Sequence, residues 1–375
     1  MSAKRRLLEA HAKKSPVPAD WMSHFSHVPL PNMIMPGAHD AAAHELETTA
    51  APDCDLENAA FWVSIPFLSS CCVRPWCVTQ SGPAEALLRC GCRYFDLRLG
   101  VDDRISNRCG ERFRLCHGLL GPGLGQWLGP MKAFLDAHPT EVVCLEVKFV
   151  QCFVDAGGRN ASINGVSEKD HQDVLDCIVG ALGGAARFVP AASRCTPLGE
   201  LVRAHQQVHL VYCDACPGGT MHEYAAVCHP SSVLRSHWPN KCDAQKVVKE
   251  LDEELVRSAA GNADRFLVLQ GVLTPGGNDI VRGIAGCGAC ADGSIRDLAK
   301  RIAPELCMML SRPDGAVAQH LRHGAIVMVD FASESFNDAL MKIITDLNYG
   351  IHKQRVTADT ELMSEQQSGS SKTLK

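Results

Sequence analysis

Several kinds of segment are missing from this chain of 375 residues, and each absence excludes a class of protein. No window reaches about 18 uncharged apolar residues, so we expect no transmembrane helix. Residues 1–20 lack the apolar stretch of about 7–15 residues that a secretory signal peptide needs. Neither sign of charge dominates, since 37 Lys and Arg face 42 Asp and Glu. A net charge of −5 and a pI near 6.3 predict no general attraction to nucleic acid or to an anionic membrane.

Aromatic residues are also scarce, at 6%, whereas cysteine is frequent, with 19 residues. An odd number of cysteines at irregular spacing, without an export signal, disfavours a secreted disulfide framework. We therefore expect an intracellular protein whose thiols are reduced. Free cysteines commonly fill apolar space, and Cys92, Cys116 and Cys144 lie in apolar runs where this is expected.

Short apolar runs alternate with longer mixed stretches of helical character, which predicts βα units and an α/β fold. The runs are near-continuous in Val, Ile and Leu, as is typical of parallel strands buried on both faces. Because the length suits a barrel of about 250 residues with additions, we favour an irregular TIM barrel in a single domain over an open sheet. The predicted strands cover 33–35, 94–99, 114–116, 141–149, 208–212, 266–273 and 325–331, and the predicted helices cover 83–90, 128–137, 168–182, 243–259 and 294–310.

The predicted barrel domain spans residues 28–350. A polar leader, 1–27, precedes it, and a polar tail, 351–375, follows it and is expected to be disordered. Two stretches do not fit βα units and are assigned as irregular insertions. Residues 53–82 are apolar and aromatic but interrupted by prolines, and residues 272–297 are rich in glycine. Loops of this length are usually functional or disordered.

Reactive side chains stand at the ends of several apolar runs. In a TIM barrel, catalytic groups lie where strands end and the following loops begin. The chain lacks a GxSxG elbow, a Walker A sequence, an HExxH motif and a dinucleotide-binding fingerprint, so no established nucleophile or cofactor motif competes with these side chains. The candidates at strand ends are His39, Asp40, Asp96, Arg98, His117, Glu146, Lys148 and Asp330.

Two imidazoles and one guanidinium suit phosphodiester cleavage by general acid–base catalysis. One histidine removes a proton from an attacking hydroxyl and the other gives a proton to the leaving oxygen, while an arginine balances charge on the phosphoryl oxygens. An unperturbed imidazole pKa of about 6.5 allows both protonation states near neutral pH. Ordinary structural interpretations also exist, such as an ion pair between Asp96 and Arg98 inside a barrel. The shared position of the candidates at strand ends favours the catalytic hypothesis.

Four segments carry a resemblance to a known family: MPGAHD, CGCRYFDLRLG, LCHGLL and FLDAHPTEVVCLEVKF. Their order and spacing resemble the X domain of phosphatidylinositol-specific phospholipase C over about residues 30–150. The later stretches VLQGVLTPGGNDI, AGCGACADG and IVMVDF look closest to the protozoan glycosylphosphatidylinositol (GPI)-specific branch. The resemblance implies an irregular TIM barrel and a phosphoric diester hydrolase, or diacylglycerol-lyase, that cleaves the bond between phosphate and diacylglycerol. The substrate would be phosphatidylinositol or a GPI glycolipid.

The same resemblance implies a role for each acid–base candidate. His39 matches the general base on the inositol 2-hydroxyl, and Asp330 matches the carboxylate that orients this base. His117 matches the general acid that protonates the diacylglycerol oxygen, and Asp40 matches the carboxylate that pairs with this acid. The expected product is an inositol 1,2-cyclic phosphate, which a slower step with exchanged histidine roles could hydrolyse.

Within this resemblance, Arg98 indicates whether catalysis depends on calcium, since it matches an arginine that contacts the phosphate. Calcium-dependent relatives carry a carboxylate there and gather oxygen ligands for the metal. A guanidinium is always charged and would repel a bound cation, so we predict catalysis without metal or other cofactor. Glu146, which matches a calcium ligand of the metal-dependent relatives, is the one residue that argues the other way. Asp96 shares the strand face of Arg98 and is expected to fix either Arg98 or the acid.

Three further residues are candidate substrate contacts. Lys148 matches a lysine that approaches the inositol ring, and Gln270 ends a late predicted strand. Cys213 stands where relatives carry an inositol-contacting arginine. Loss of that arginine predicts altered headgroup affinity without loss of bond cleavage.

A protein with this substrate has to reach a membrane surface, and we expect peripheral association. An apolar loop is a candidate interface, and a loop packed under the barrel is the alternative. The loop contains Phe61, Trp62, Phe67 and Trp76, together with Cys71, Cys72 and Cys77.

Cysteines near the glycine-rich insertion offer a second route to the membrane, because Cys287 and Cys290 are candidate S-acylation sites. Together with Cys213 and Cys216 they also form two CxxC pairs. The separation of these pairs far exceeds the spacing usual in zinc sites, so zinc is disfavoured.

Two other functions stay open. One is a different TIM-barrel phosphodiesterase, such as a metal-dependent glycerophosphodiesterase or a sphingomyelinase-like enzyme, which Arg98 disfavours. The other is a non-catalytic lipid-binding barrel, which the joint presence of His39, Arg98, His117 and Asp330 disfavours. The oligomeric state is not predicted.

Overall fold

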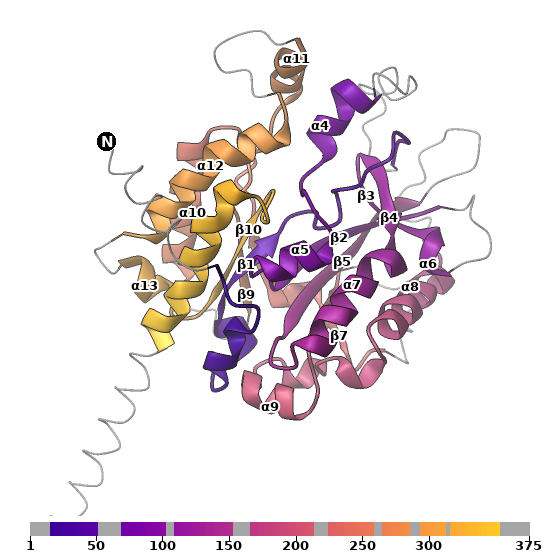
Figure 1. The fold of residues 1–375 in the computed structure, drawn as a ribbon, viewed down its shortest axis with the longest axis vertical. Helices are drawn as coiled ribbons and strands as arrows, with labels where there is room; N and C mark the ends of the chain where they lie inside the picture. Colours follow the sequence, from indigo (N-terminus) through magenta and orange to yellow (C-terminus); the bar gives the residue numbers. More distant parts are fainter. Residues whose placement is uncertain are drawn as a thin grey trace, which may run out of the picture.

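The computed structural model describes residues 16–51, 69–102, 109–152, 166–213, 224–258, 265–285, 293–312 and 316–352. Within them, one curled sheet of ten strands forms the centre, and helices cover its outer face (Figure 1). Eight of these strands pair in parallel in the order β7-β6-β5-β2-β1-β10-β9-β8. They are β1 (Ile34–Ala38), β2 (Tyr94–Val101), β5 (Val143–Cys152), β6 (Val208–Tyr212), β7 (Cys228–Pro230), β8 (Leu234–His237), β9 (Phe266–Gln270) and β10 (Ala325–Val329).

This architecture confirms the predicted α/β fold of the irregular TIM-barrel type. The barrel is irregular in two respects. Strands β7 and β8 lie at the two ends of the strand order, and the described residues show no pairing between them, so the sheet stays open there. Strands β3 (Phe113–His117) and β4 (Leu119–Gly123) form an antiparallel hairpin that is added to β2. Gly118, at the turn of this hairpin, has a φ of 67°, which glycine adopts readily.

The predicted helices are present, with shifts of a few residues at their ends. A capping box of Ser167 and Asp170 starts α8, and the Ser294 side chain caps α12. Helix α7 starts at Leu124, before the predicted residue 128, and contains Pro130. The helices are α4 (Arg74–Cys77), α5 (Ala84–Arg89), α6 (Cys109–Arg112), α7 (Leu124–Ala137), α8 (Glu168–Ala181), α9 (Leu198–Arg203), α10 (Ala244–Ser258), α11 (Gly277–Ala285), α12 (Ile295–Leu310), α13 (Ala316–Leu321) and a last helix over 338–352.

The helices lie in two groups around the sheet. Helices α10, α12 and α13 pack together on one side, and α5, α7 and α8 pack on the other (Figure 1). The apolar layer between strands and helices is the larger core, and it contains Cys92. Cys92, Cys116 and Cys144 are all buried, which confirms the expected core positions of these thiols.

A second core fills the barrel interior. Alternate residues of neighbouring strands point inward, as the twofold side-chain period requires, and supply Met35, Tyr94 and Cys144 among others. The short 3-10 helix η1 (Trp21–Phe25) lies below this core, and Trp21 is fully buried. The packed unit therefore begins before residue 28, inside the stretch 1–27 that was assigned to a polar leader.

Two buried histidines lie inside the barrel, His209 on β6 and His229 on β7, with ring centroids 5.1 Å apart. Burial lowers the pKa of both imidazoles, and for His209 the neighbouring His229 lowers it further. The unfolded chain binds protons at these residues near pH 6.5, whereas the folded chain keeps them neutral. Since their folded pKa values are depressed, stability is lost as the pH falls below about 6.5, by at most about 1.4 kcal/mol per pH unit for each histidine.

Replacement of His209 by phenylalanine is therefore expected to reduce the loss of stability between pH 7.5 and pH 5.5. Urea unfolding midpoints of the wild type and of His209→Phe at both pH values measure this difference. An equal pH dependence in the two proteins would show that His209 does not contribute.

Candidate functional site

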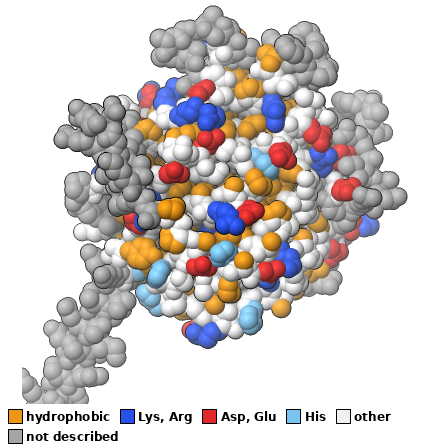
Figure 2. Space-filling view, in the orientation of Figure 1, with side chains coloured by type: hydrophobic (Ala, Val, Ile, Leu, Met, Phe, Trp, Pro, Cys, Tyr) orange, Lys and Arg blue, Asp and Glu red, His pale blue; other side chains and the backbone are white. Residues whose placement is uncertain are grey.

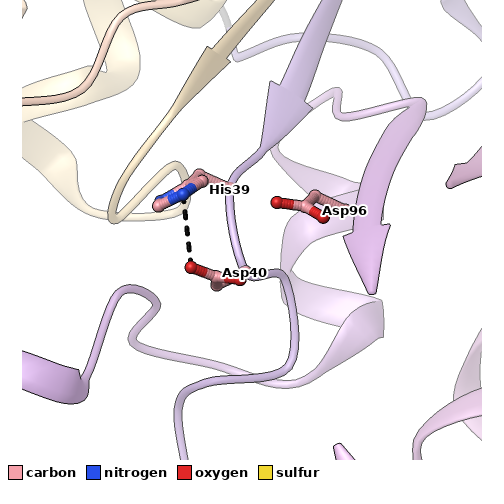
Figure 3. Close-up of side chains that lie close together, drawn as sticks. All are labelled: His39, Asp40 and Asp96. Atoms are coloured by element: carbon pink, nitrogen blue, oxygen red, sulfur yellow. Dashed lines mark ion pairs between the residues drawn. The ribbon is translucent and has the colours of Figure 1, made fainter. Parts of the chain in front are cut away.

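Ionisable side chains gather where β1, β2, β5 and β10 end. These four strands are neighbours in the sheet. The side chains at their carboxyl ends therefore meet next to the apolar core of the barrel interior. Figure 3 shows three of them: His39 and Asp40 lie just after β1, and Asp96 lies on β2. Strand β3 adds His117 from the hairpin. The structure thus brings the acid–base candidates of the sequence together at the carboxyl end of the barrel.

His39 is paired with Asp330, with 2.8 Å between Nδ1 and Oδ1. An ionised carboxylate only accepts hydrogen bonds, so a neutral His39 carries its proton on Nδ1 and exposes the lone pair of Nε2. The Arg98 Nη2 lies 3.0 Å from this Nε2 and can donate to it. Burial lowers the pKa of His39, but Asp40 and Asp330 outweigh burial and raise the pKa above 6.5. His39 is thus in the tautomer that a general base needs.

Asp40 joins the two histidines and the arginine. Its Oδ1 lies 2.5 Å from Arg98 Nε, and its Oδ2 lies 3.2 Å from His39 Nε2 and 3.4 Å from His117 Nε2. The dashed line in Figure 3 marks the pair with His39. The carboxylate is 1% exposed, so water screens these interactions little. One buried carboxylate therefore faces both imidazoles.

His117 is held from its other ring nitrogen. Its Nδ1 lies 2.7 Å from the backbone carbonyl of Cys77, which can only accept, so Nδ1 carries a proton. The Nε2 atom faces Asp40, and a protonated His117 would donate to it. The rings of His39 and His117 stand roughly at right angles, with centroids 6.1 Å apart. Both Nε2 atoms therefore face the same carboxylate oxygen, Oδ2 of Asp40.

Asp96 fixes the two cations of the site. Its oxygens lie 3.2 Å from Arg98 Nη2 and 2.9 Å from Lys148 Nζ. Burial would raise the pKa of Asp96, but Lys148 and Arg98 lower it far below its usual range. The pKa of Lys148 is raised in turn, because Asp96 and Glu146 outweigh its burial. Asp96 was expected to fix either Arg98 or the acid, and it contacts Arg98.

Glu146 lies beside Lys148, with 3.3 Å between Oε1 and Nζ. The Tyr94 hydroxyl donates to Glu146, and the Cys213 thiol lies 3.5 Å from the same carboxylate. Cys213 therefore borders the site through Glu146. Gln270 ends β9 at the same end of the barrel and donates to the Ser236 hydroxyl at 2.8 Å, outside the ionic cluster.

A metal ion has one candidate donor set among the described residues, formed by His39, Asp40 and Asp96, whose ligand atoms lie within 4.8 Å of one another. The Arg98 guanidinium contacts all three of these side chains. A divalent cation at this set would have to displace the permanent positive charge of Arg98 from two carboxylates that it contacts, Asp40 and Asp96. These residues fit an arginine-centred site better than a metal site.

Sequence reasoning missed the polar groups that hold the strand ends. Thr79 and Gln80 are buried, and their side chains donate to the backbone carbonyls of Asp40 and His39, respectively. Asn337 donates to the carbonyl of Asp330 at 3.0 Å. Two adjacent polar residues in an apolar stretch, at 79–80, were the only signal in the sequence.

The proposed membrane loop is corrected at one position. Trp76 is only 8% exposed and packs into the core between sheet and helices, as in the alternative that the sequence left open. Of the cysteines in this loop, Cys77 is buried, Cys72 is half-buried and Cys71 is exposed. The aromatic residues Phe61, Trp62 and Phe67 lie outside the described residues, as do the acylation candidates Cys287 and Cys290 and Cys216 of the CxxC alternative. In the described part of the chain, no helix combines the length and hydropathy needed to cross a membrane.

Comparison with known proteins finds relatives of this chain. No family model matches the chain. It is 28% identical over 276 residues to PI-PLC X domain-containing protein 2 of Mus musculus, which covers 72% of this chain and 73% of the relative. It is 24% identical over 279 residues to PI-PLC X domain-containing protein 3 of Homo sapiens, covering 71% of this chain and 78% of the relative.

Solved structures show the same fold. The chain aligns with a phosphatidylinositol-specific phospholipase C from Staphylococcus aureus at a TM-score of 0.59 and 18% identity, over 88% of this chain and 97% of that one. The enzyme of the same name from Listeria monocytogenes gives a TM-score of 0.56 and 14% identity, over 88% and 98%. The predicted resemblance to the X-domain family is confirmed, whereas the closer resemblance to its protozoan GPI-specific branch is not.

Proposed function

We propose that this relative of the X-domain proteins is a phospholipase C that cleaves phosphatidylinositol or a GPI glycolipid by metal-independent general acid–base catalysis. The observation that supports this most is the Asp40 carboxylate, which contacts His39, Arg98 and His117 together. Two histidines in complementary roles around a guanidinium are what the cleavage of a phosphodiester by an internal hydroxyl requires.

In the proposed reaction, Nε2 of His39 removes the proton of the inositol 2-hydroxyl. The 2-oxygen then forms a bond to phosphorus, and the bond from phosphorus to the diacylglycerol oxygen breaks. His117 gives its Nε2 proton to that leaving oxygen, so diacylglycerol departs neutral. Asp330 stabilises the His39 imidazolium from Nδ1, and Arg98 balances charge on the phosphoryl oxygens.

The first product is an inositol 1,2-cyclic phosphate, because the nucleophile belongs to the substrate. At that point His39 is protonated and His117 is neutral, which is the reverse of the starting state. Water could then be activated by His117 in a slower hydrolysis of the cyclic ester, and His39 would return its proton. This step restores both histidines to their starting states.

Lys148, Cys213 and Gln270 are proposed headgroup contacts. Lys148 is the residue of this group with an exposed charge, at 30% side-chain exposure, next to Asp96. Cys213 directly follows β6, at the position where the family resemblance implies an arginine. Glu146 therefore contacts a thiol there instead of a guanidinium. A substituted inositol, as in a GPI glycolipid, and free phosphatidylinositol both remain within the proposal.

We propose peripheral contact with a membrane surface at the carboxyl rim of β8 and β9. Trp238, after β8, is 51% exposed, and its indole donates to Thr274 after β9. Val281 on the nearby α11 is 64% exposed. On the face seen in Figure 2, basic and acidic side chains are mixed, so on this face no single positive area would drive binding. Cys287 and Cys290, proposed acylation sites, follow α11 in the sequence.

Independence from metal ions can be tested directly. Because Arg98 contacts all three candidate ligands, we expect full release of diacylglycerol from labelled phosphatidylinositol, or of a GPI-anchored protein from its anchor, in excess EDTA. The two substrates are compared in detergent micelles, and their relative rates name the preferred one. Activity that disappears in EDTA and returns with calcium would refute metal-independence. No cleavage of either substrate would refute the proposed function.

A further inference from the structure

Gln80 joins the ends of β1 and β10. These strands are followed by His39 and Asp330, whose hydrogen-bonded pair is called the His39–Asp330 dyad. Its side chain is completely buried. The amide nitrogen donates to the carbonyl of His39 at 2.8 Å and to the carbonyl of Val329 at 3.2 Å. The amide oxygen accepts from the backbone nitrogen of Ala332 at 3.0 Å. One side chain thereby ties the end of β1 to the end of β10 on both sides of Asp330.

Only a primary amide can make this set of contacts. It offers two donors and one acceptor in one plane, whereas a carboxylate has no donor and an aliphatic chain has neither. The contacts with Val329 and Ala332 are buried, and the contact with the His39 carbonyl is partly buried. The Val329 carbonyl also accepts from the His39 nitrogen, but a replacement that cannot bond would remove the Gln80 partner of the Ala332 nitrogen and of the His39 carbonyl. The chemistry of residue 80 is therefore specified by its surroundings.

The neighbouring turns need external support. Asp40 has a φ of 39° and Phe331 a φ of 51°, in the left-handed region that non-glycine residues avoid. Thr79, next to Gln80, donates its hydroxyl to the Asp40 carbonyl at 3.0 Å, and its backbone carbonyl accepts from the Phe331 nitrogen at 2.6 Å. Residues 79–80 therefore hold both strained turns, each beside one dyad residue.

We propose that Gln80 is a positioning residue that sets the geometry of the His39–Asp330 dyad. The inference rests on the proposed function for its kinetic readout. The Asp330 Oδ1 must stay within hydrogen-bond distance of His39 Nδ1 to fix the basic tautomer, and the two residues follow different strands. Without Gln80, the backbone bond from the His39 nitrogen to the Val329 carbonyl at 3.1 Å still pairs the two strands. The His39 carbonyl and the Ala332 nitrogen would lose their shared link, so the segments that carry the two side chains would be held less firmly. A displacement of about 1 Å can cost about 100-fold in rate.

Gln207 provides a matched control. It is also a buried glutamine, and its amide nitrogen bonds three backbone carbonyls, those of Leu135, His138 and Glu141, at 3.1–3.2 Å. It precedes β6, at the end of the barrel opposite to the site. Gln80→Met and Gln207→Met remove similar numbers of hydrogen bonds at similar burial.

Steady-state kinetics and thermal unfolding of both variants give the first test. We expect similar decreases in Tm, a fall in kcat of about 10–100-fold for Gln80→Met with KM changed less than about threefold, and a kcat within about twofold of wild type for Gln207→Met. Gln80→Asn, which keeps an amide but is one carbon shorter, is expected to lie between wild type and Gln80→Met and serves if Gln80→Met does not fold. An unchanged kcat at position 80, or equal kcat losses in the two Met variants, would overturn the proposal.

An NMR titration of His39 without substrate gives a test that does not need turnover. The groups that face His39 are Asp40, Asp96, Asp330, Arg98 and His117. Loss of its contact with Asp330 removes a carboxylate that raises the pKa, so the pKa of His39 should fall in the Gln80 variants and not in Gln207→Met. An unchanged pKa would overturn positioning. A lowered pKa in a chain whose wild type cleaves no lipid would support positioning and refute the proposed function.

Discussion

Replacing either His39 or His117 by alanine is expected to lower the turnover of phosphatidylinositol by about 10²–10⁴, the usual contribution of a general acid or base. In the proposed reaction, His39→Ala removes the acceptor of the 2-hydroxyl proton, and His117→Ala removes the donor to the leaving oxygen. If the two histidines act as a unit, the double variant should lose little more than the worse single variant. Release of labelled diacylglycerol under single-turnover conditions measures these rates.

His138→Ala is the control for this comparison. His138 is partly buried, and its Nδ1 lies 2.8 Å from an Asp20 carboxylate oxygen, so His138→Ala also removes a histidine–carboxylate pair. His138 follows α7, at the end of the barrel opposite to the site. Its turnover should match the wild type. Losses below about tenfold in both His39→Ala and His117→Ala would contradict acid–base catalysis by these two residues.

Asp40→Asn is expected to lower turnover by about 10²–10⁴, comparable to the loss when the orienting aspartate of a catalytic triad becomes asparagine. The substitution keeps the shape of the side chain but removes the charge that faces His39, Arg98 and His117. A neutral amide would stabilise neither imidazolium, and it would leave Arg98 with one anionic partner fewer.

The pH profile of this variant provides a signature beyond the loss of rate. Asp40 raises the pKa of His39 in the wild type, so Asp40→Asn should lower it. A general base acts above its pKa. The rising limb of kcat/KM should therefore lie above pH 6.5 in the wild type and move to lower pH in the variant. Asp170→Asn, which removes another buried aspartate paired with an arginine, Arg112, should leave the limb in place. If the rising limb of the kcat/KM profile lies at the same pH in Asp40→Asn as in the wild type, the proposed action of Asp40 on His39 is contradicted.

The positions of the site residues could be predicted because strand ends are visible in the sequence. A parallel strand buried on both faces is a short apolar run, and a charged or imidazole side chain that ends it is conspicuous. This is why Asp96, Arg98, Lys148 and Asp330 were found, and the structure places them at one end of the barrel. The second strand of the hairpin, β4 over Leu119–Gly123, was missed because its glycines and proline are typical of a turn.

The groups that hold the site could not be predicted in the same way. The carbonyl of Cys77, the hydroxyl of Thr79 and the amide of Gln80 act through contacts with the backbone of segments far away in the sequence. Such contacts leave no spacing pattern. Trp76 stands in an apolar stretch that was interpreted either as a membrane interface or as a packed loop, and it occupies a buried position. Periodicity cannot separate these two cases in a stretch interrupted by prolines.

The most direct test of the account is a phosphorus-31 NMR time course of phosphatidylinositol with the purified chain in excess EDTA. If the 2-hydroxyl is the nucleophile and His39 and His117 are the base and acid, the first phosphorus product is an inositol 1,2-cyclic phosphate, and a phosphomonoester follows only later. Appearance of the phosphomonoester first, or absence of any product until a divalent cation is added, would contradict the account.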